Sequence, residues 1–204
     1  MAGFAPLTLP REVALGLQHG DPVAQAEAYR LLAPRVLGMA ARILGDRGLA
    51  EEVVQDTFVS MIERGGTLES AAAAVGWIRQ TAVNHCLMRL RSPWVQRRAA
   101  ELPVDAMDPR EDAPRAEGLR DLERALTRLG AETRMVLWLH DVEGYTHQEI
   151  GRLFGKTESY SKSQLARGYR KLLERTGQSE AEPLGDRKDD GYARATDLGP
   201  ACAS

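Results

Sequence analysis

The stretch FGKTESYSKSQLARGYRKLL, residues 154–173, sets basic and polar residues side by side directly after a glycine. Helical spacing brings together one inner face, made of Ser161, Leu165, Tyr169 and Leu172. Thr157 can cap this helix, because its hydroxyl can accept a hydrogen bond from a free amide of the first turn. The stretch therefore predicts an amphipathic helix whose outer face is basic and polar.

A shorter helix is predicted just before it. Thr146 opens a Thr-x-x-Glu capping box, in which each side chain can satisfy the other's free backbone amide. Ile150 and Leu153 would point inward, and the helix would end near Gly155. Two short helices joined by a tight turn, the second of them basic on its outer face, are typical of a helix-turn-helix.

The outer face of the second helix predicts binding in the major groove of DNA. Lys and Arg reach phosphates or guanine edges, Gln suits adenine, and Ser takes either partner. A solvated surface helix is the alternative, and the charge run alone would favour it. The capped first helix, the glycine turn and the net charge of +5 over residues 152–175, from seven basic and two acidic residues, together favour DNA. The candidate DNA-binding residues are Lys156, Glu158, Ser159, Tyr160, Lys162, Ser163, Gln164, Arg167, Arg170 and Lys171.

Length, composition and cysteine spacing argue against a membrane protein, a zinc protein and an enzyme. At 204 residues and 43% hydrophobic, the chain can bury a core and suits two small domains better than one. No run approaches the roughly 18 apolar residues of a membrane span, and no signal-peptide pattern opens the chain, so we expect a cytoplasmic protein without membrane insertion. Neither Cys86 and Cys202 nor the four histidines show a zinc spacing. We expect no metal, no cofactor and, without a nucleophile–base pair or phosphate loop, no enzyme.

Three further helices are predicted in the N-terminal half. The first ends at Gly45 and has an apolar face of Tyr29, Leu32, Val36, Ala40, Ile43 and Leu44. The second ends at Gly65 and packs through Ala50, Val53, Val54, Thr57, Phe58, Met61 and Ile62, with acidic and polar residues opposite. The third begins near Ala73 and carries Trp77, which we assign to the core. Because no alternating strand pattern appears, we predict an all-α fold.

Charge and proline content divide the chain. Residues 101–121 hold seven acids and three prolines, with too little apolar surface to offset the entropy of ordering them. We therefore predict five segments: an N-terminal lead-in (1–24), a first helical domain (25–98), an acidic flexible linker (99–121), a helix-turn-helix domain (122–175) and a disordered tail (176–204).

Two separated motifs resemble a known family in its own order. ILGDRGLAEEVVQDTFVSMIE, residues 43–63, resembles the second-helix signature of bacterial sigma factors of the extracytoplasmic-function (ECF) group, within the sigma-70 family. GWIRQTAVNHCLMRLRS, residues 76–92, resembles the promoter-melting helix that follows it. The segment 129–172 is similar to their fourth region, so the likeness covers about residues 25–98 and 122–174.

The resemblance implies a sigma factor with a region 2-like bundle and a region 4-like helix-turn-helix, which binds core RNA polymerase and promoter DNA. The helix 157–174 would then read the minus-thirty-five element. The implied core-binding residues are Glu51, Glu52, Gln55 and Asp56, although an ordinary solvated face has the same spacing. The implied minus-ten residues are Arg79, Asn84, Arg89, Arg91, Arg97 and Arg98, and the loop 65–74 corresponds to the segment that reads a flipped base.

Three positions depart from the family's pattern. Met88 stands where the family often has Asp, and Ser161 stands where a small aliphatic residue is usual, which predicts looser packing of the recognition helix. The loop GGTLESAAAA, residues 65–74, lacks the expected aromatic and acidic residues. These departures bear on the promoter sequence rather than on the general role.

Two other functions stay open from the sequence. A stand-alone helix-turn-helix regulator would dimerise through its N-terminal helices and bind a palindromic operator without polymerase. A protein-interaction module that sequesters a regulator would tolerate charge reversal at Arg167 and Lys171. The sequence is silent on the promoter, on the inducing signal, on the role of the tail and on the anti-sigma factor that would be a further partner of such a protein.

Overall fold

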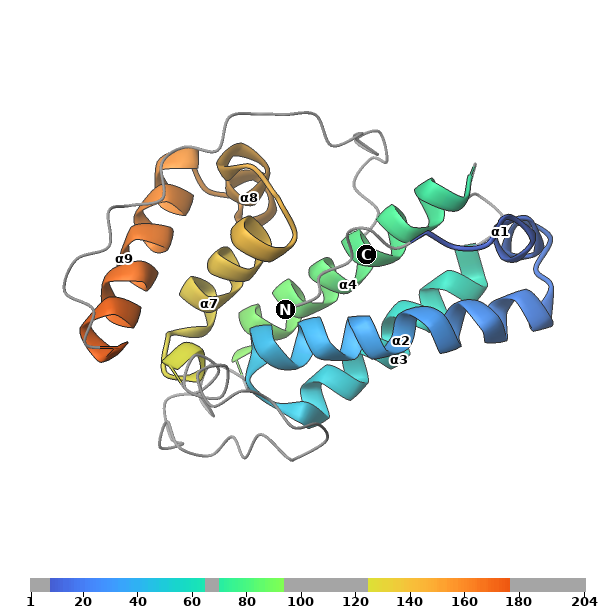
Figure 1. Ribbon diagram of the computed structural model, residues 1–204, viewed down its shortest axis with the longest axis horizontal. Coiled ribbons are helices and arrows are strands. Elements are labelled where there is room, and N and C mark those ends of the chain that lie inside the picture. The colour runs from blue at the N-terminus through green and yellow to red at the C-terminus, as the bar shows by residue number, and fades with distance from the viewer. Residues whose placement is uncertain (1–7, 65–69, 94–124, 177–204) are drawn as a thin grey trace.

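The computed structural model describes residues 8–64, 70–93 and 125–176 (Figure 1). Every regular element in these ranges is helical, which confirms the all-α prediction for this part of the chain. The predicted linker and almost all of the predicted tail lie outside the described residues. None of the described helices combines the length and the apolar character that crossing a membrane requires.

Four helices form the N-terminal unit: α1 (Arg11–Gln18), α2 (Pro22–Leu44), α3 (Arg47–Arg64) and α4 (Ala71–Arg91). α2, α3 and α4 pack against one another, and α1 lies against α2 and α4. α1 lies in the segment for which the sequence predicts only a lead-in. The helix is anchored there because Leu17 is 1% exposed and because the Asp21 carboxylate caps the start of α2.

The predicted core of this unit is largely confirmed. Leu32, Val36 and Ile43 are completely buried on α2, and Trp77 is partly buried against the core, as assigned. Two predicted core residues are not buried: Tyr29 is 51% exposed, with its ring edge against Phe58, and Ile62 is 57% exposed. Both lie at the margin of the packed face, where the helical period alone does not decide which side a neighbouring helix covers.

Within the described residues, the C-terminal unit contains α7 (Ala131–Leu137), η2 (Trp138–Val142), α8 (His147–Phe154) and α9 (Glu158–Thr176), and residues 125–127 before them are also helical. The backbone passes from α7 directly into η2, a π-helical turn in which the Glu143 amide donates to the Trp138 carbonyl. Gly144, with φ of +72°, ends this segment. Figure 1 shows α7 between α9 and the helices of the N-terminal unit, and buried residues of both units belong to one hydrophobic cluster.

Candidate nucleic-acid interface

The turn between α8 and α9 has the predicted geometry. The Thr146 amide donates to Glu149 Oε2 at 2.8 Å, and the Glu149 amide donates to Thr146 Oγ1 at 3.2 Å, so the capping box is complete. At the other end of α8, Gly155 adopts φ of +64° and the Lys156 amide donates to the Gly151 carbonyl at 2.8 Å. This left-handed glycine closes the helix and turns the chain sharply into α9.

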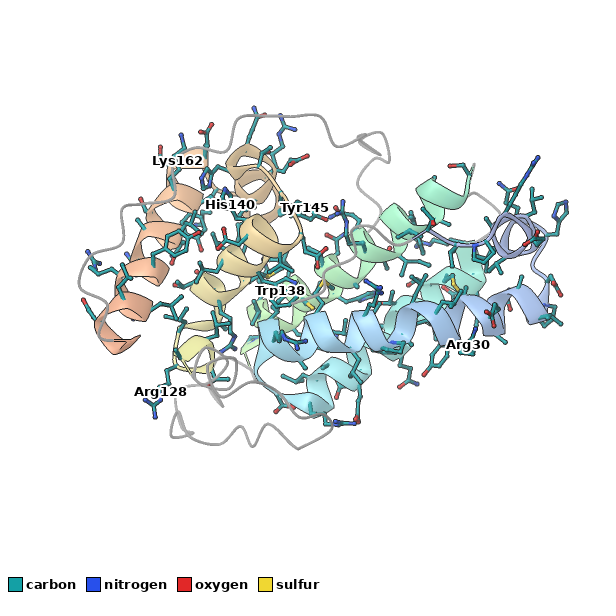
Figure 2. All side chains as sticks on the ribbon, viewed as in Figure 1. Arg30, Arg128, Trp138, His140, Tyr145 and Lys162 are labelled. Atoms are coloured by element: carbon teal, nitrogen blue, oxygen red, sulfur yellow. The ribbon has the colours of Figure 1, made fainter. Side chains whose placement is uncertain are left out.

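α9 presents a polar and basic surface to solvent. Its first turn is capped by Thr157, whose hydroxyl accepts from the Tyr160 amide at 3.4 Å. Glu158 and Lys162 pair at 2.7 Å, and this contact holds the pKa of Glu158 below its ordinary value. Figure 2 shows Lys162 at the outer edge of the helix. The exposed candidates are Lys156, Glu158, Ser159, Lys162, Ser163, Arg167, Arg170 and Lys171.

Two of the DNA-binding candidates of α9, Gln164 and Tyr160, do not lie on its exposed face. Gln164 is 8% exposed, and its Oε1 accepts from the Thr133 hydroxyl at 2.7 Å, so this amide faces α7 rather than solvent. Tyr160 is half-buried and donates to Glu132 Oε2 at 2.6 Å. Its burial and this bond raise the pKa of Tyr160. The prediction of an outward-facing Gln164 was wrong, because α7 approaches this side of α9 closely.

The close approach of α9 to α7 depends on Gly168. A Cβ at this position would lie 2.6 Å from Leu137 Cδ1, so a larger residue would require the side chains of α7 to shift. Ser161, the unusual residue of the inner face, is completely buried, and its hydroxyl lies 3.0 Å from His147 Nδ1. The hydroxyl thus has a partner where an aliphatic side chain would only pack. Farther along α9, the Tyr169 hydroxyl donates a hydrogen bond to Asp141 Oδ1 at 2.8 Å.

The described minus-ten candidates lie on α4 in different surroundings. Asn84 is exposed, and its Oδ1 accepts from Gln80 at 3.1 Å. Arg89 binds Asp56 and Glu52 of α3, with distances of 2.6 and 3.1 Å. Arg79 and Arg91 both reach the C-terminal unit, where they donate to backbone carbonyls. The other candidates, Arg97 and Arg98, lie outside the described residues, as does the loop up to residue 69.

The outer face of α3 carries the core-binding candidates. Glu51, Glu52 and Gln55 are exposed and Asp56 is half-buried. Glu51 pairs with Arg47 at 2.9 Å, one turn before it.

The same face of α3 also has an apolar part, which was not among the predicted site residues. Val59 is 47% exposed and Ile62 is 57% exposed, and both follow Glu52 and Gln55 at helical spacing. The signal was present in the sequence, because positions 52, 55, 59 and 62 fall on one stripe of a helix. We name these four residues the α3 stripe.

The remaining titratable groups of α4 support packing. Cys86 is completely buried, and burial raises the pKa of its thiol to about 12, which keeps it protonated. Burial also lowers the pKa of its neighbour His85, against the opposing effect of Asp56. Within residues 8–64, 70–93 and 125–176, no cluster of His, Cys, Asp and Glu could hold a metal ion.

A capped helix-turn-helix with an exposed basic second helix, carried beside a separate helical bundle, defines a DNA-binding transcription protein. Comparison with known sequences narrows this class. The family described as Sigma-70 region 2 matches residues 28–95, and that described as Sigma-70, region 4 matches residues 119–172.

Relatives and a solved structure agree with these matches. The RNA polymerase sigma factor CarQ of Myxococcus xanthus is 32% identical over 155 residues, which cover 74% of this chain and 87% of CarQ. The ECF RNA polymerase sigma factor SigF of Caulobacter vibrioides is 29% identical over 160 residues, 76% of this chain and 87% of SigF. The sigma factor RpoE from Bartonella quintana, solved with the anti-sigma factor NepR, has the same fold, with a TM-score of 0.56, 20% identity, and coverage of 76% of this chain and 98% of RpoE.

The chain therefore belongs to the sigma-70 family, as an RNA polymerase sigma factor of the extracytoplasmic-function group. It is a transcription initiation factor, and neither the stand-alone regulator nor the sequestering module is favoured.

Proposed function

We propose that this sigma factor initiates transcription through three separate surfaces on the described helices. The α3 stripe, with Glu51 and Asp56, docks on core RNA polymerase. α4 captures the opened minus-ten strand, and α9 enters the major groove of the minus-thirty-five element. The segment limits predicted above remain part of this proposal, with domains at 25–98 and 122–175.

The single observation that carries the proposal is the exposed basic face of α9. Arg167, Arg170 and Lys171 are all exposed on a helix whose opposite side is fixed to α7 and α8. A helix that is packed on one side and basic on its exposed side suits major-groove docking, in which cations meet phosphates and polar side chains meet base edges. Lys156, Glu158, Ser159, Lys162 and Ser163 complete this face. Tyr160 and Gln164 orient the helix from its inner side.

The α3 stripe supports the second contact. Apolar side chains exposed within an acidic and polar surface are typical of protein interfaces, where a small apolar centre is surrounded by polar groups. Val59 and Ile62 supply that centre, and Glu52 and Gln55 supply part of the polar edge.

The third contact uses α4. Asn84 offers an amide to the edge of an unstacked base, and Arg79, Arg89 and Arg91 offer cations to the backbone of the strand. Arg97 and Arg98 extend this set along the chain. The remaining parts of the proposal are a site of action in the cytoplasm, no catalytic centre and control by an anti-sigma factor, as the solved relative's complex suggests.

Run-off transcription tests the proposal. Sigma-free core polymerase is incubated with fragmented genomic DNA, with and without this protein, and the transcript starts are sequenced. We expect new starts that share two spaced upstream elements. If no new starts appear and the protein also fails to bind core polymerase, the scheme is wrong at its first step. Lys171→Gln tests the contact of α9, and Arg11→Gln, at an exposed position of α1, is its matched control. We expect the new starts to be weaker with Lys171→Gln than with Arg11→Gln.

A further inference from the structure

An exposed apolar side chain lies beside Asn84 on α4. Met88 is 51% exposed, and among the described residues of this helix it is the only large apolar one that is exposed. A single exposed methionine is ordinary on a protein surface. The position of Met88 distinguishes it, because it follows Asn84 by four residues, and this spacing places both side chains on the same side of a helix. Both are open to solvent.

The neighbours of Met88 along the chain are directed elsewhere. Leu87 is 4% exposed and belongs to the hydrophobic core. Arg89 binds Asp56 of α3, with Nη2 2.6 Å from Oδ2. The side of α4 that carries Asn84 and Met88 is therefore the side on which a partner can approach.

Arg91 adds a cation to this side of α4. It follows Met88 by three residues, so it lies on the same face, and it is exposed. Its Nη2 donates to the Leu153 carbonyl at 3.0 Å, but a guanidinium has five N–H donors, so one such bond leaves donors for a phosphate. We name Asn84, Met88 and Arg91 the α4 stripe. It combines an amide, a thioether and a guanidinium and contains no acid, whereas an Asp at position 88 would place a carboxylate between the amide and the cation.

The thioether determines which base this stripe can distinguish. A methionine side chain donates no hydrogen bond and its sulfur is a weak acceptor, so it does not read a base edge through hydrogen bonds. It can form apolar contacts, and thymine is the one base whose edge carries a methyl group. Its sulfur also packs favourably against aromatic rings. The Met88 side chain therefore suits thymine better than the other three bases.

We propose that Met88 is a specificity-determining residue that contacts the 5-methyl group of a thymine in the minus-ten element. The inference rests on the proposed function, which assigns Asn84 and Arg91 to that strand. Four residues of helix rise by about 6 Å, and successive bases of a stacked strand are about 3.4 Å apart. The thymine should therefore lie within two nucleotides of the base that Asn84 binds.

The test uses deoxyuridine, which differs from thymidine only in lacking the 5-methyl group. Run-off transcription first defines the minus-ten element, and its thymines on the strand that α4 captures are then replaced one at a time. Anisotropy of a fluorescein-labelled promoter fragment gives the apparent Kd for holoenzyme. With the parent protein, we expect one replacement to raise the apparent Kd roughly fourfold, the factor that burial of one methyl group contributes.

Two variants at position 88 assign the contact to this side chain. Met88→Leu keeps an apolar side chain and should keep the preference for thymine over deoxyuridine. Met88→Ser removes the apolar surface and should bind the two promoters equally. Because Met88 is half exposed, neither change should prevent folding, which circular dichroism checks.

Two further variants locate the contact and control for a general surface effect. Val23 is an aliphatic residue of α2 that is 76% exposed, so Val23→Ser also replaces exposed apolar surface by a hydroxyl, and it should keep the preference in full. Asn84→Ala, measured on promoters with single base changes, identifies the base that Asn84 binds. The thymine that responds to Met88 should lie within two nucleotides of that base.

Three results would overturn the inference. No thymine replacement weakens binding, the weakening persists unchanged in Met88→Ser, or Val23→Ser loses the preference as fully as Met88→Ser does. In each case, new transcript starts with the parent protein would leave the proposed function standing. If the parent protein gives no new starts, the proposed function fails first and the inference fails with it, so the two failures can be distinguished.

Discussion

Arg89 of α4 binds Asp56 of α3, with Nη2 2.6 Å from Oδ2, and so joins the helix proposed to receive DNA to the helix proposed to bind polymerase. Its Nε also lies 3.1 Å from Glu52 Oε2. One guanidinium thus pairs with two acids of the α3 surface. The two proposed surfaces are consequently not independent, because a change in the charge of one alters the partner of the other.

This arrangement predicts measurable coupling between Arg89 and Asp56. In a double-mutant cycle of Arg89→Gln and Asp56→Asn, we expect a coupling free energy of about 0.5–1 kcal/mol in urea unfolding, near the upper end for pairs that are partly open to water. Arg30 and Glu27 form an exposed pair at 2.6 Å on α2 and are the control. Coupling no greater than in that control pair would contradict the structural role of Arg89.

Ile62 should matter for polymerase binding and little for folding. Because its side chain is 57% exposed, Ile62→Asp should change the free energy of unfolding by no more than about 0.5 kcal/mol. If Ile62 lies at the centre of the interface, the same change should weaken the affinity for core polymerase at least about tenfold. Val23→Asp is the matched control, since Val23 is an aliphatic residue of α2 that is 76% exposed. Equal affinities for the two variants would remove Ile62 from the interface.

Gln164 should contribute to stability instead of to reading bases. Gln164→Ala leaves the buried hydroxyl of Thr133 without its acceptor at 2.7 Å. We expect a loss of about 1–3 kcal/mol in the free energy of unfolding, as is usual for a buried polar group left unsatisfied. Ser163→Ala, at an exposed neighbouring position, should have almost no effect on unfolding. An unchanged denaturation midpoint for Gln164→Ala would show that the buried position is not maintained in solution.

Lys171 provides a test of the contact between α9 and DNA. If its exposed ammonium group binds a phosphate, Lys171→Gln should reduce the slope of log affinity against log salt concentration by about 1, because one fewer counterion is released. The measurement is a salt titration of double-stranded promoter DNA bound by holoenzyme. A slope identical to that of the parent protein would place Lys171 away from the backbone.

His85 makes stability depend on pH. Burial lowers the pKa of folded His85 below the ordinary value of 6.5, so the unfolded chain takes up a proton at a higher pH than the folded chain does. The free energy of unfolding should therefore fall as the pH decreases below about 6.5, and level off below the folded pKa. Urea unfolding of the parent protein and of His85→Gln at neutral and mildly acidic pH measures this. On acidification the parent protein should lose more stability than His85→Gln, and equal losses would contradict the assignment.

Most of the helix ends and turns could be predicted because they depend on residues that are close together in the sequence. The caps at Thr146, Gly45 and Gly155 depend on residues a few positions apart, so the sequence indicates them directly. The errors at Ile62 and Gln164 have a different origin, because the exposure of a residue at the margin of a helix face depends on which distant helix lies beside it.

The contact that joins α7 to the end of α2 has no local signal at all. Arg134 donates to Ile43 across 91 positions of the chain, and a buried arginine that binds carbonyls looks in the sequence like any surface arginine. The π-helical turn at η2 was equally hidden, since its residues follow the apolar pattern of an ordinary helix.

Arg134 also lies over Gly45, the residue that ends α2, where a Cβ would lie 2.7 Å from Arg134 Nη2. This pairing limits how such a protein can be recombined. A chimera can keep the first three helices and take its C-terminal unit from a relative. It then has glycine at position 45, but the side chain opposite Gly45 is the one that the relative carries. Unless that side chain is another arginine, the hybrid loses the bond from position 134 to the Ile43 carbonyl near the end of α2. A chimera of this factor should therefore take positions 45 and 134 from the same parent.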